Sequence, residues 1–160
     1  MQSPVIVEVQ DIHSKQSIVE TLYQVDNNES RLEAVRLLLQ AHQPETTLIF
    51  CNTKVETDQV ANELRAVGYE ALALHGDLEQ KERDQTLVRF ANRSASVLVA
   101  TDVAARGLDI DALDLVINYQ VARELEVHTH RIGRTGRAGA QGIACTLHTQ
   151  KENHKIGLLE

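Results

Sequence analysis

Short apolar runs alternate along the chain with longer segments in which apolar residues recur every three or four positions. Short runs bounded by polar residues predict buried strands, and the longer periodic segments predict amphipathic helices. The predicted strands cover residues 18–25, 47–51, 71–74, 97–100, 115–118 and 142–147.

Polar caps and inward-facing apolar residues define the predicted helices between these strands. A short polar residue followed three positions later by Glu or Gln predicts a helix start, as at Ser30–Glu33, Thr53–Glu56 and Asp77–Gln80. The inward-facing positions that follow are Leu32, Val35, Leu38, Leu39, Val60, Leu64, Val67, Leu87 and Phe90. The second helix is expected to stop at Gly68, and a last helix to cover residues 151–159.

This alternation predicts an α/β fold, an open parallel β-sheet with helices on both faces. Several strands are apolar throughout, as expected when helices cover both faces of a sheet. The 160 residues suffice for a single domain with a substantial core. We expect that domain to span residues 18–160, and residues 1–17 to form a linker or an edge segment.

Composition and charge narrow the function. The longest apolar runs fall well short of the ~20 residues that span a membrane, and residues 1–10 lack the features of a signal peptide. Cys51 and Cys145 lie in apolar runs and are expected to be buried thiols of a cytoplasmic protein. The net charge of −7 argues against a general nucleic-acid binder, although four arginines lie between Arg123 and Arg137.

Three of those arginines, Arg131, Arg134 and Arg137, fall at three-residue spacing among glycines at 133, 136 and 139. This spacing lets guanidinium groups fan toward one point, where their planar donors would suit phosphate oxygens, while glycine permits close approach of a ligand or backbone. The alternative is a solvated basic helix end followed by a turn. A metal site at His128-x-His130 is not expected, because the sequence offers no third ligand at a suitable spacing.

Polar clusters follow the predicted strands directly, at Asn52–Lys54, His75–Asp77 and Thr101–Asp109. The carboxyl ends of parallel strands share one edge of a sheet, so these clusters and the arginines are expected to gather there. Each cluster alone could be a helix cap, a turn or a surface ion pair such as Arg106 with Asp109. Together they indicate a phosphate-binding face.

The clusters also resemble, in order and spacing, the motifs of the second RecA-like domain of DEAD-box RNA helicases. Residues 48–54 resemble motif IV, His75–Asp77 with Gln80-x-x-Arg83 motif IVa, residues 101–109 motif V, and residues 130–137 motif VI. Residues 74–110 and 126–131 are most similar to the bacterial DbpA subfamily. Gln120, Ala122 and His128 stand where most family members have Asp, Pro and Tyr.

The resemblance implies roles for individual residues. Arg134 and Arg137 resemble arginine fingers that reach the γ-phosphate, and Gly107 and Asp109 join them in the ATP-binding set. RNA-backbone contacts are implied for Asn52, Thr53, Gly76, Asp77 and Thr101. Coupling between the domains is implied for Gln80, Arg83, His130 and Arg131.

The sequence contains neither a Gly-x-x-x-x-Gly-Lys-Ser/Thr phosphate loop nor an Asp-Glu-Ala-Asp motif. The resemblance therefore implies an upstream RecA-like domain that holds ATP and Mg²⁺, and allows for a C-terminal RNA-binding domain. We expect the isolated domain to be inactive, and the parent to be a monomeric RNA-stimulated ATPase acting on structured ribosomal RNA in ribosome biogenesis. The alternatives are a stand-alone RNA- or protein-binding module and half of a DNA helicase.

Overall fold

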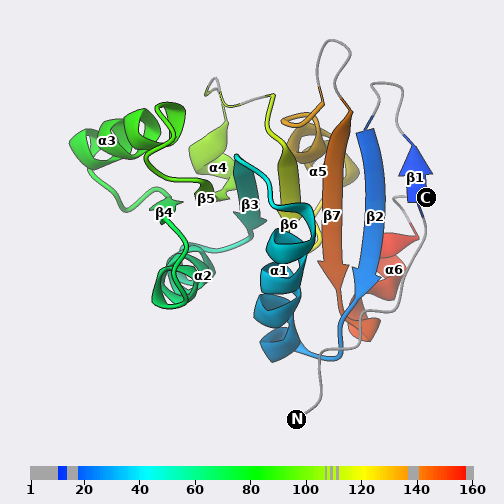
Figure 1. The fold of residues 1–160 in the computed structure, drawn as a ribbon. Helices are drawn as coiled ribbons and strands as arrows, with labels where there is room; N and C mark the ends of the chain where they lie inside the picture. The colour runs from blue at the N-terminus through cyan, green and yellow to red at the C-terminus, as the bar shows by residue number, and fades with distance from the viewer. Residues whose placement is uncertain are drawn as a thin grey trace.

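A seven-stranded open sheet runs through the middle of the molecule (Figure 1). The computed structural model describes residues 11–13, 18–106, 108, 110, 112–136 and 141–157. The strands are β1 (Asp11–His13), β2 (Ile18–Gln24), β3 (Thr47–Cys51), β4 (Ala71–Leu74), β5 (Val97–Thr101), β6 (Leu115–Asn118) and β7 (Gly142–His148). Their order across the sheet is β1-β2-β7-β6-β3-β5-β4.

Strands β2 to β7 pair only in parallel with one another, which confirms the predicted parallel sheet. The exception in the sheet is β1, an edge strand that pairs antiparallel with β2 from Asp11↔Thr21 to His13↔Val19. This strand falls within residues 1–17, and the domain boundary at residue 18 stays a prediction.

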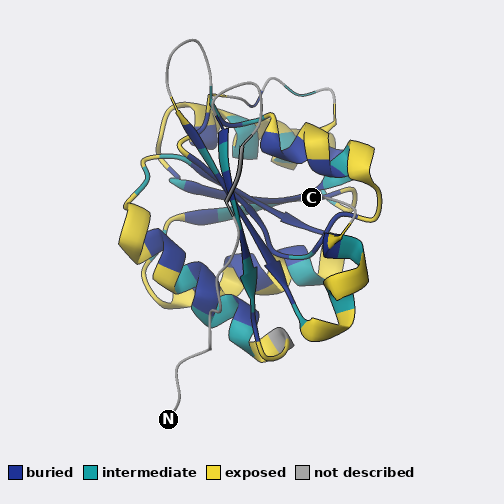
Figure 2. Ribbon diagram, turned by 90° about the vertical axis from the view of Figure 1, so that its right-hand side faces the viewer, coloured by how far each residue is buried: buried dark blue, intermediate teal, exposed yellow. Residues whose placement is uncertain are grey.

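Helices cover both faces of the sheet, as predicted. They are α1 (Asn28–His42), α2 (Lys54–Ala66), α3 (Gln80–Ala91), α4 (Asp102–Ala105), α5 (Leu125–Ile132) and α6 (Asn153–Ile156), with a 3₁₀ turn at Gln150–Glu152. In Figure 2 the strands are mostly buried between helices whose outer faces are exposed. None of the described helices has the length and apolar character needed to cross a membrane.

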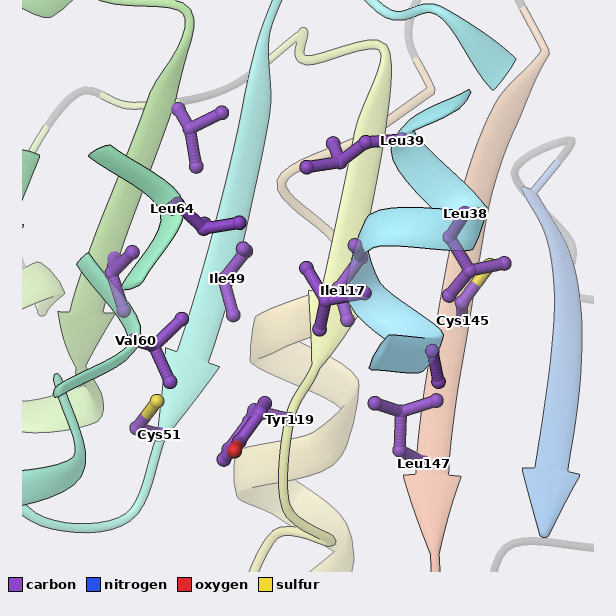
Figure 3. Packing of buried hydrophobic residues seen from close by; sticks show 14 of the residues in the cluster. Leu38, Leu39, Ile49, Cys51, Val60, Leu64, Ile117, Tyr119, Cys145 and Leu147 are labelled. Carbon is purple, nitrogen blue, oxygen red and sulfur yellow. The ribbon is translucent and has the colours of Figure 1, made fainter. Parts of the chain in front are cut away.

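The larger of the two main cores lies between α1, α2 and one face of the sheet (Figure 3). Leu38, Leu39, Val60 and Leu64 from the helices pack there against strand residues such as Ile117. On the opposite face, Phe90 of α3 and the small residues of α4 pack against alternate residues of β3, β5 and β6. Each central strand therefore contributes side chains to both cores, which explains why its sequence is apolar throughout.

Two predicted helix starts were wrong. Helix α1 begins after Asn27, whose side chain accepts from the Ser30 backbone N–H at 3.0 Å, so Ser30 lies inside the first turn. Helix α3 begins after Glu79, which exchanges capping hydrogen bonds with Glu82. Several cap-forming residues fall within one turn at each site, and the sequence pattern alone selects the wrong one.

Two further predictions need correction. Val67 is not on the inner face of α2 but is 45% exposed, because the helix ends at Ala66 and Gly68 turns the chain with φ +103°. The continuous helix predicted over residues 151–159 is instead the 3₁₀ turn followed by the four-residue α6. Thr149 caps this turn reciprocally with Glu152; residues 158–160 lie outside the described part.

Candidate functional site

The polar loops after β6, β3, β5 and β4 occupy neighbouring positions along the carboxyl edge of the sheet. These four strands are consecutive in the sheet and parallel, so their C-terminal loops meet at one edge, as predicted. Helix α5, which follows the β6 loop, places the side chain of Arg131 at the same edge, where it contacts Asn52 and Asp102. The expectation that all the arginines gather there is wrong for Arg134, whose backbone lies beside Leu113, before β6 begins. The sequence-predicted clusters are therefore brought together by the topology alone.

Arg131, in the last turn of α5, is the centre of this edge. It is 1% exposed, and its Nε and Nη2 donate to the two carboxylate oxygens of Asp102, each at 2.7 Å. Nη2 also donates to Asn52 Oδ1 at 2.7 Å, and Nη1 to the Gln120 carbonyl at 2.8 Å. Arg131 thus joins the loops after β5, β3 and β6, so it serves this edge as an internal crosslink.

Arg134 contacts a different segment of the chain, the residues that follow α4. Its guanidinium donates to the backbone carbonyls of Leu108 at 2.7 Å, Ile110 at 3.0 Å and Ala105 at 3.1 Å. The arginines therefore do not fan toward one point as expected, since Arg131 is committed to the interior and Arg134 to the segment after α4. Gly107, Asp109, Arg137 and Gly139 lie outside the described residues.

The absence of a side chain at Gly136 allows a close approach, as expected, and the group that approaches it is the backbone of Gly142. The φ of Gly136 is +76°, and a Cβ there would lie 3.1 Å from the Gly142 backbone nitrogen. The chain leaving α5 thus crosses the start of β7 at a distance that excludes a side chain.

A recess of about 250 Å³ opens beside this network. It is lined by Phe50, Asp102, Ala105, Arg106, Val127, His130, Arg131 and Arg134. The Arg131 guanidinium lies 5.2 Å from the centroid of the Phe50 ring and neutralises Asp102. Arg106 and His130 are exposed, so the remaining charged and polar groups of the recess suit an anionic ligand such as a phosphate.

The loop after β3 carries two of the residues assigned to RNA. Thr53 caps α2, its Oγ1 accepting from the Glu56 N–H at 3.2 Å, and it is exposed. Asn52 is half-buried and bonds internally, because Oδ1 accepts from Arg131 and Nδ2 donates to the Val121 carbonyl at 3.2 Å. Thr53 is thus accessible to a ligand, while the Asn52 side chain helps to hold the loop.

The loop after β4 carries two more of the residues assigned to RNA, Gly76 and Asp77. Gly76 and Asp77 are both exposed, and Lys54 Nζ lies 2.8 Å from Asp77 Oδ1. The hydrogen bond and the charge of Lys54 lower the pKa of Asp77. This ion pair links the loop after β4 to the first residue of α2.

The remaining assigned residues lie along the same edge. Thr101 is 9% exposed and caps α4, accepting from the Ala104 N–H at 3.3 Å. Gln80 donates to Asp84 within α3 at 2.8 Å, and Arg83 Nε is buried without a hydrogen-bond partner among the described residues.

Sequence reasoning missed several residues that build the site. Gln120 accepts from the Asn52 N–H and donates to Glu56, each at 2.7 Å, and only its departure from the family pattern singled it out. His128 is buried against Glu20 of β2, a residue 108 positions away, and no sequence signal pairs the two. Within the described residues, no group of three or more potential ligands could hold a metal ion.

Comparisons with known proteins agree with this architecture. Residues 30–139 match the family of the helicase conserved C-terminal domain. The chain is 46% identical to the ATP-dependent RNA helicase DbpA of Escherichia coli K12 over 99% of its length, and 47% identical to the putative DEAD-box RNA helicase HEL64 of Trypanosoma brucei brucei over 82%. It spans 34% of the first protein and 24% of the second.

Solved structures give the same result. The E. coli DEAD-box protein SrmB, bound to regulator of ribonuclease activity A, superposes with a TM-score of 0.82 at 30% identity, covering 92% of this chain and 85% of that one. The C-terminal domain of the DEAD-box protein Dbp5 gives 0.81 at 30% identity, covering 89% and 83%. The predicted RecA-like fold and the resemblance to DbpA are confirmed, and the chain belongs to the helicase C-terminal domain family of DEAD-box proteins.

Proposed function

We propose that this chain is the second core domain of an ATP-dependent DEAD-box RNA helicase. In this role it supplies arginine fingers for ATP hydrolysis and half of an RNA-backbone clamp, and an upstream RecA-like domain of the same protein supplies the phosphate loop and the Mg²⁺ ligands. The chain covers only about a third of E. coli DbpA, so the activity belongs to the larger protein.

The crosslink made by Arg131 carries this proposal. One buried guanidinium connects the loops that resemble motifs IV and V to the helix that carries motif VI. A solvated basic helix end would leave that arginine exposed, whereas Arg131 is 1% exposed. The edge is thus preorganised, as a site that must hold charged ligands requires.

We assign ATP to the recess side of this edge, with Gly107, Asp109, Arg134 and Arg137 as its residues here. Three donors of Arg134 hold the carbonyls of Ala105, Leu108 and Ile110, so this arginine fixes described residues on the chain next to the assigned Gly107 and Asp109. Its other two N–H groups have no hydrogen-bond partner among the described residues and can serve a phosphate oxygen. We assign the RNA backbone to Thr53, Gly76, Asp77, Thr101 and the Asn52 loop.

The test compares the RNA-stimulated ATPase of the full helicase with its Arg137→Ala and Arg137→Lys variants. An arginine finger contributes ~10³-fold or more to the rate, and lysine lacks the planar fork, so both variants should lose activity on that scale. The exposed Arg89 on α3 gives a matched control, Arg89→Ala. Near-normal turnover in Arg137→Ala would refute the finger assignment.

The RNA class and setting are further parts of the proposal. The similarity to DbpA supports a structured ribosomal RNA as target and a role in ribosome biogenesis, and the buried thiols of Cys51 and Cys145 agree with a cytoplasmic location. ATPase stimulation by structured ribosomal RNA, by an unstructured RNA and by DNA of the same length would separate these substrates. Equal stimulation by DNA would contradict the proposal.

A further inference from the structure

Two carboxylates of α2 are each connected, through one intermediate side chain, to a backbone N–H of a loop assigned to RNA. The first connection runs through Gln120, whose Nε2 donates to Glu56 Oε2 and whose Oε1 accepts from the Asn52 N–H, both at 2.7 Å. It fastens the loop after β6 to the loop that begins α2.

The second connection runs through His75, the first residue after β4. Its Nε2 lies 2.9 Å from Asp58 Oδ1, and its Nδ1 accepts from the Asp77 N–H at 3.2 Å. Because a backbone N–H can only donate, Nδ1 is unprotonated, and the proton on Nε2 points at Asp58. The ring is neutral in this arrangement and only 4% of the residue is exposed.

The intermediate residues share one chemical property, since glutamine and neutral histidine each carry a donor at one end and an acceptor at the other. An ionised carboxylate accepts only, so it could not donate to Glu56 from position 120. Gln120 meets this requirement, and the Asp that most family members carry at this position would not.

The geometry of α2 explains how two of its carboxylates can reach two different loops. Glu56 and Asp58 are two residues apart on a helix, so they point to different sides. One side faces the loop after β6 and the other the loop after β4, and these loops flank β3 and β5 in the sheet. The helix is itself fixed, because Val60, Ala61 and Leu64 are at most 2% exposed.

We propose that Gln120 and His75 are positioning residues, which use α2 as a strut to fix the spacing of the Asn52–Thr53 and Gly76–Asp77 loops. This inference rests on the proposed function, because the spacing matters only if both loops contact one RNA backbone. Loss of either connection then weakens RNA binding, while the hydrogen bonds that Arg131 and Arg134 make on the nucleotide side of the edge remain.

The Gln120 connection can be tested by exchanging donor and acceptor in the full helicase. Gln120→Glu keeps an acceptor for the Asn52 N–H but removes the donor and sets two carboxylates face to face. The RNA concentration giving half-maximal ATPase should rise about 3- to 10-fold, the range of one net hydrogen bond, with kcat at saturating RNA within about 2-fold. Adding Glu56→Gln reverses the direction of the bond and should restore the wild-type value.

The His75 connection is tested by a conservative pair. Asp58→Ala removes the acceptor for Nε2–H and should raise the half-maximal RNA concentration by a similar factor, whereas Asp58→Asn keeps an acceptor and should stay within about 2-fold of wild type. Hydrogen exchange of a peptide covering residues 75–82 should accelerate in Asp58→Ala alone. Glu63→Ala, an exposed carboxylate of the same helix with no ion pair among the described residues, is the control.

The outcomes separate the two levels of the argument. If the wild-type helicase responds to RNA but Asp58→Ala and Gln120→Glu respond with unchanged half-maximal concentrations, the positioning inference is wrong and the proposed function stands. Failure of Glu56→Gln to rescue Gln120→Glu, or an equal loss in Asp58→Asn and Asp58→Ala, would also overturn it. Absence of any RNA response in the wild type would overturn both.

Discussion

Replacing Arg131 should destabilise the fold far more than replacing any surface arginine. Arg131→Met keeps much of the aliphatic volume but removes the bidentate contact to Asp102 and the bonds to Asn52 Oδ1 and the Gln120 carbonyl. It leaves a carboxylate that is only 26% exposed without its counter-charge.

The size of the effect follows from these lost contacts. Removing one partner of a buried ion pair costs about 3–5 kcal/mol of unfolding free energy. The partial exposure of Asp102 lets water compensate in part, so we expect about 3 kcal/mol, the lower end. For a domain of this size that corresponds to a fall in Tm of roughly 6–12 °C.

The measurement is urea and thermal unfolding of this chain, wild type against Arg131→Met. Arg36→Ala is the matched control, since Arg36 pairs at 3.4 Å with Glu33 and both side chains are exposed; it should change stability by less than about 1 kcal/mol. The double variant Arg131→Met with Asp102→Asn removes both charges and should be more stable than Arg131→Met alone. A loss below 1 kcal/mol in Arg131→Met, or no recovery in the double variant, would refute the crosslink argument.

Three further predictions follow from other parts of the chain. Burial raises the pKa of the Cys51 and Cys145 thiols to about 12 each, so neither should react with an alkylating reagent at pH 8 until the chain unfolds; rapid labelling of the native state would contradict this. Burial lowers the pKa of His148 below its ordinary 6.5, so the unfolded chain binds more protons there and the urea midpoint should fall as the pH drops below about 6.5. The pKa of Glu152 is also lowered, because burial, which raises it, is outweighed by the hydrogen bonds from the Thr149 N–H and Arg31. The urea midpoint should therefore fall further as the pH drops below the ordinary 4.5 of Glu. A midpoint unchanged from pH 7 to 4 would contradict both assignments. RNA binding by this chain alone should be weak and should weaken further with salt, because half a clamp neutralises few phosphates; tight binding that ignores salt would indicate base readout instead.

The central strands could be predicted because burial on both faces requires apolar residues at nearly every position. β3 and β5 are buried at every position and were predicted to within one residue. The bounds of β1, within the segment expected to be a linker or an edge segment, could not be predicted, since three residues at a sheet edge need neither an apolar run nor a detectable alternation. The predicted starts of α1 and α3 were wrong for another reason, because competing caps lie within one turn of each other. Asp77, for example, pairs with Lys54 and leaves the capping of α3 to Glu79.

Some features of the candidate site could also be predicted from the sequence, and others could not. Convergence of the loops was predictable, because parallel strands put all their carboxyl ends on one edge. The different roles of Arg131 and Arg134 could not be predicted, because their three-residue spacing does not identify the groups to which each side chain donates. The partners of Arg131 lie 79 residues away for Asn52 and 29 for Asp102, and they directly follow β3 and β5, whose order in the sheet no local pattern reveals.

Asn52 is the residue at which the two networks of this edge meet. Its side-chain oxygen accepts from Arg131, on the side of the recess, and its backbone N–H donates to Gln120, on the side of α2. Both bonds are 2.7 Å long, and the Gln120 backbone carbonyl also accepts from Arg131 at 2.8 Å. A closed circuit of three short bonds thus joins Arg131, Asn52 and Gln120. Helix α5 therefore cannot shift relative to the Asn52–Thr53 loop without breaking at least one of them, which makes the arginine segment and this loop one mechanical unit.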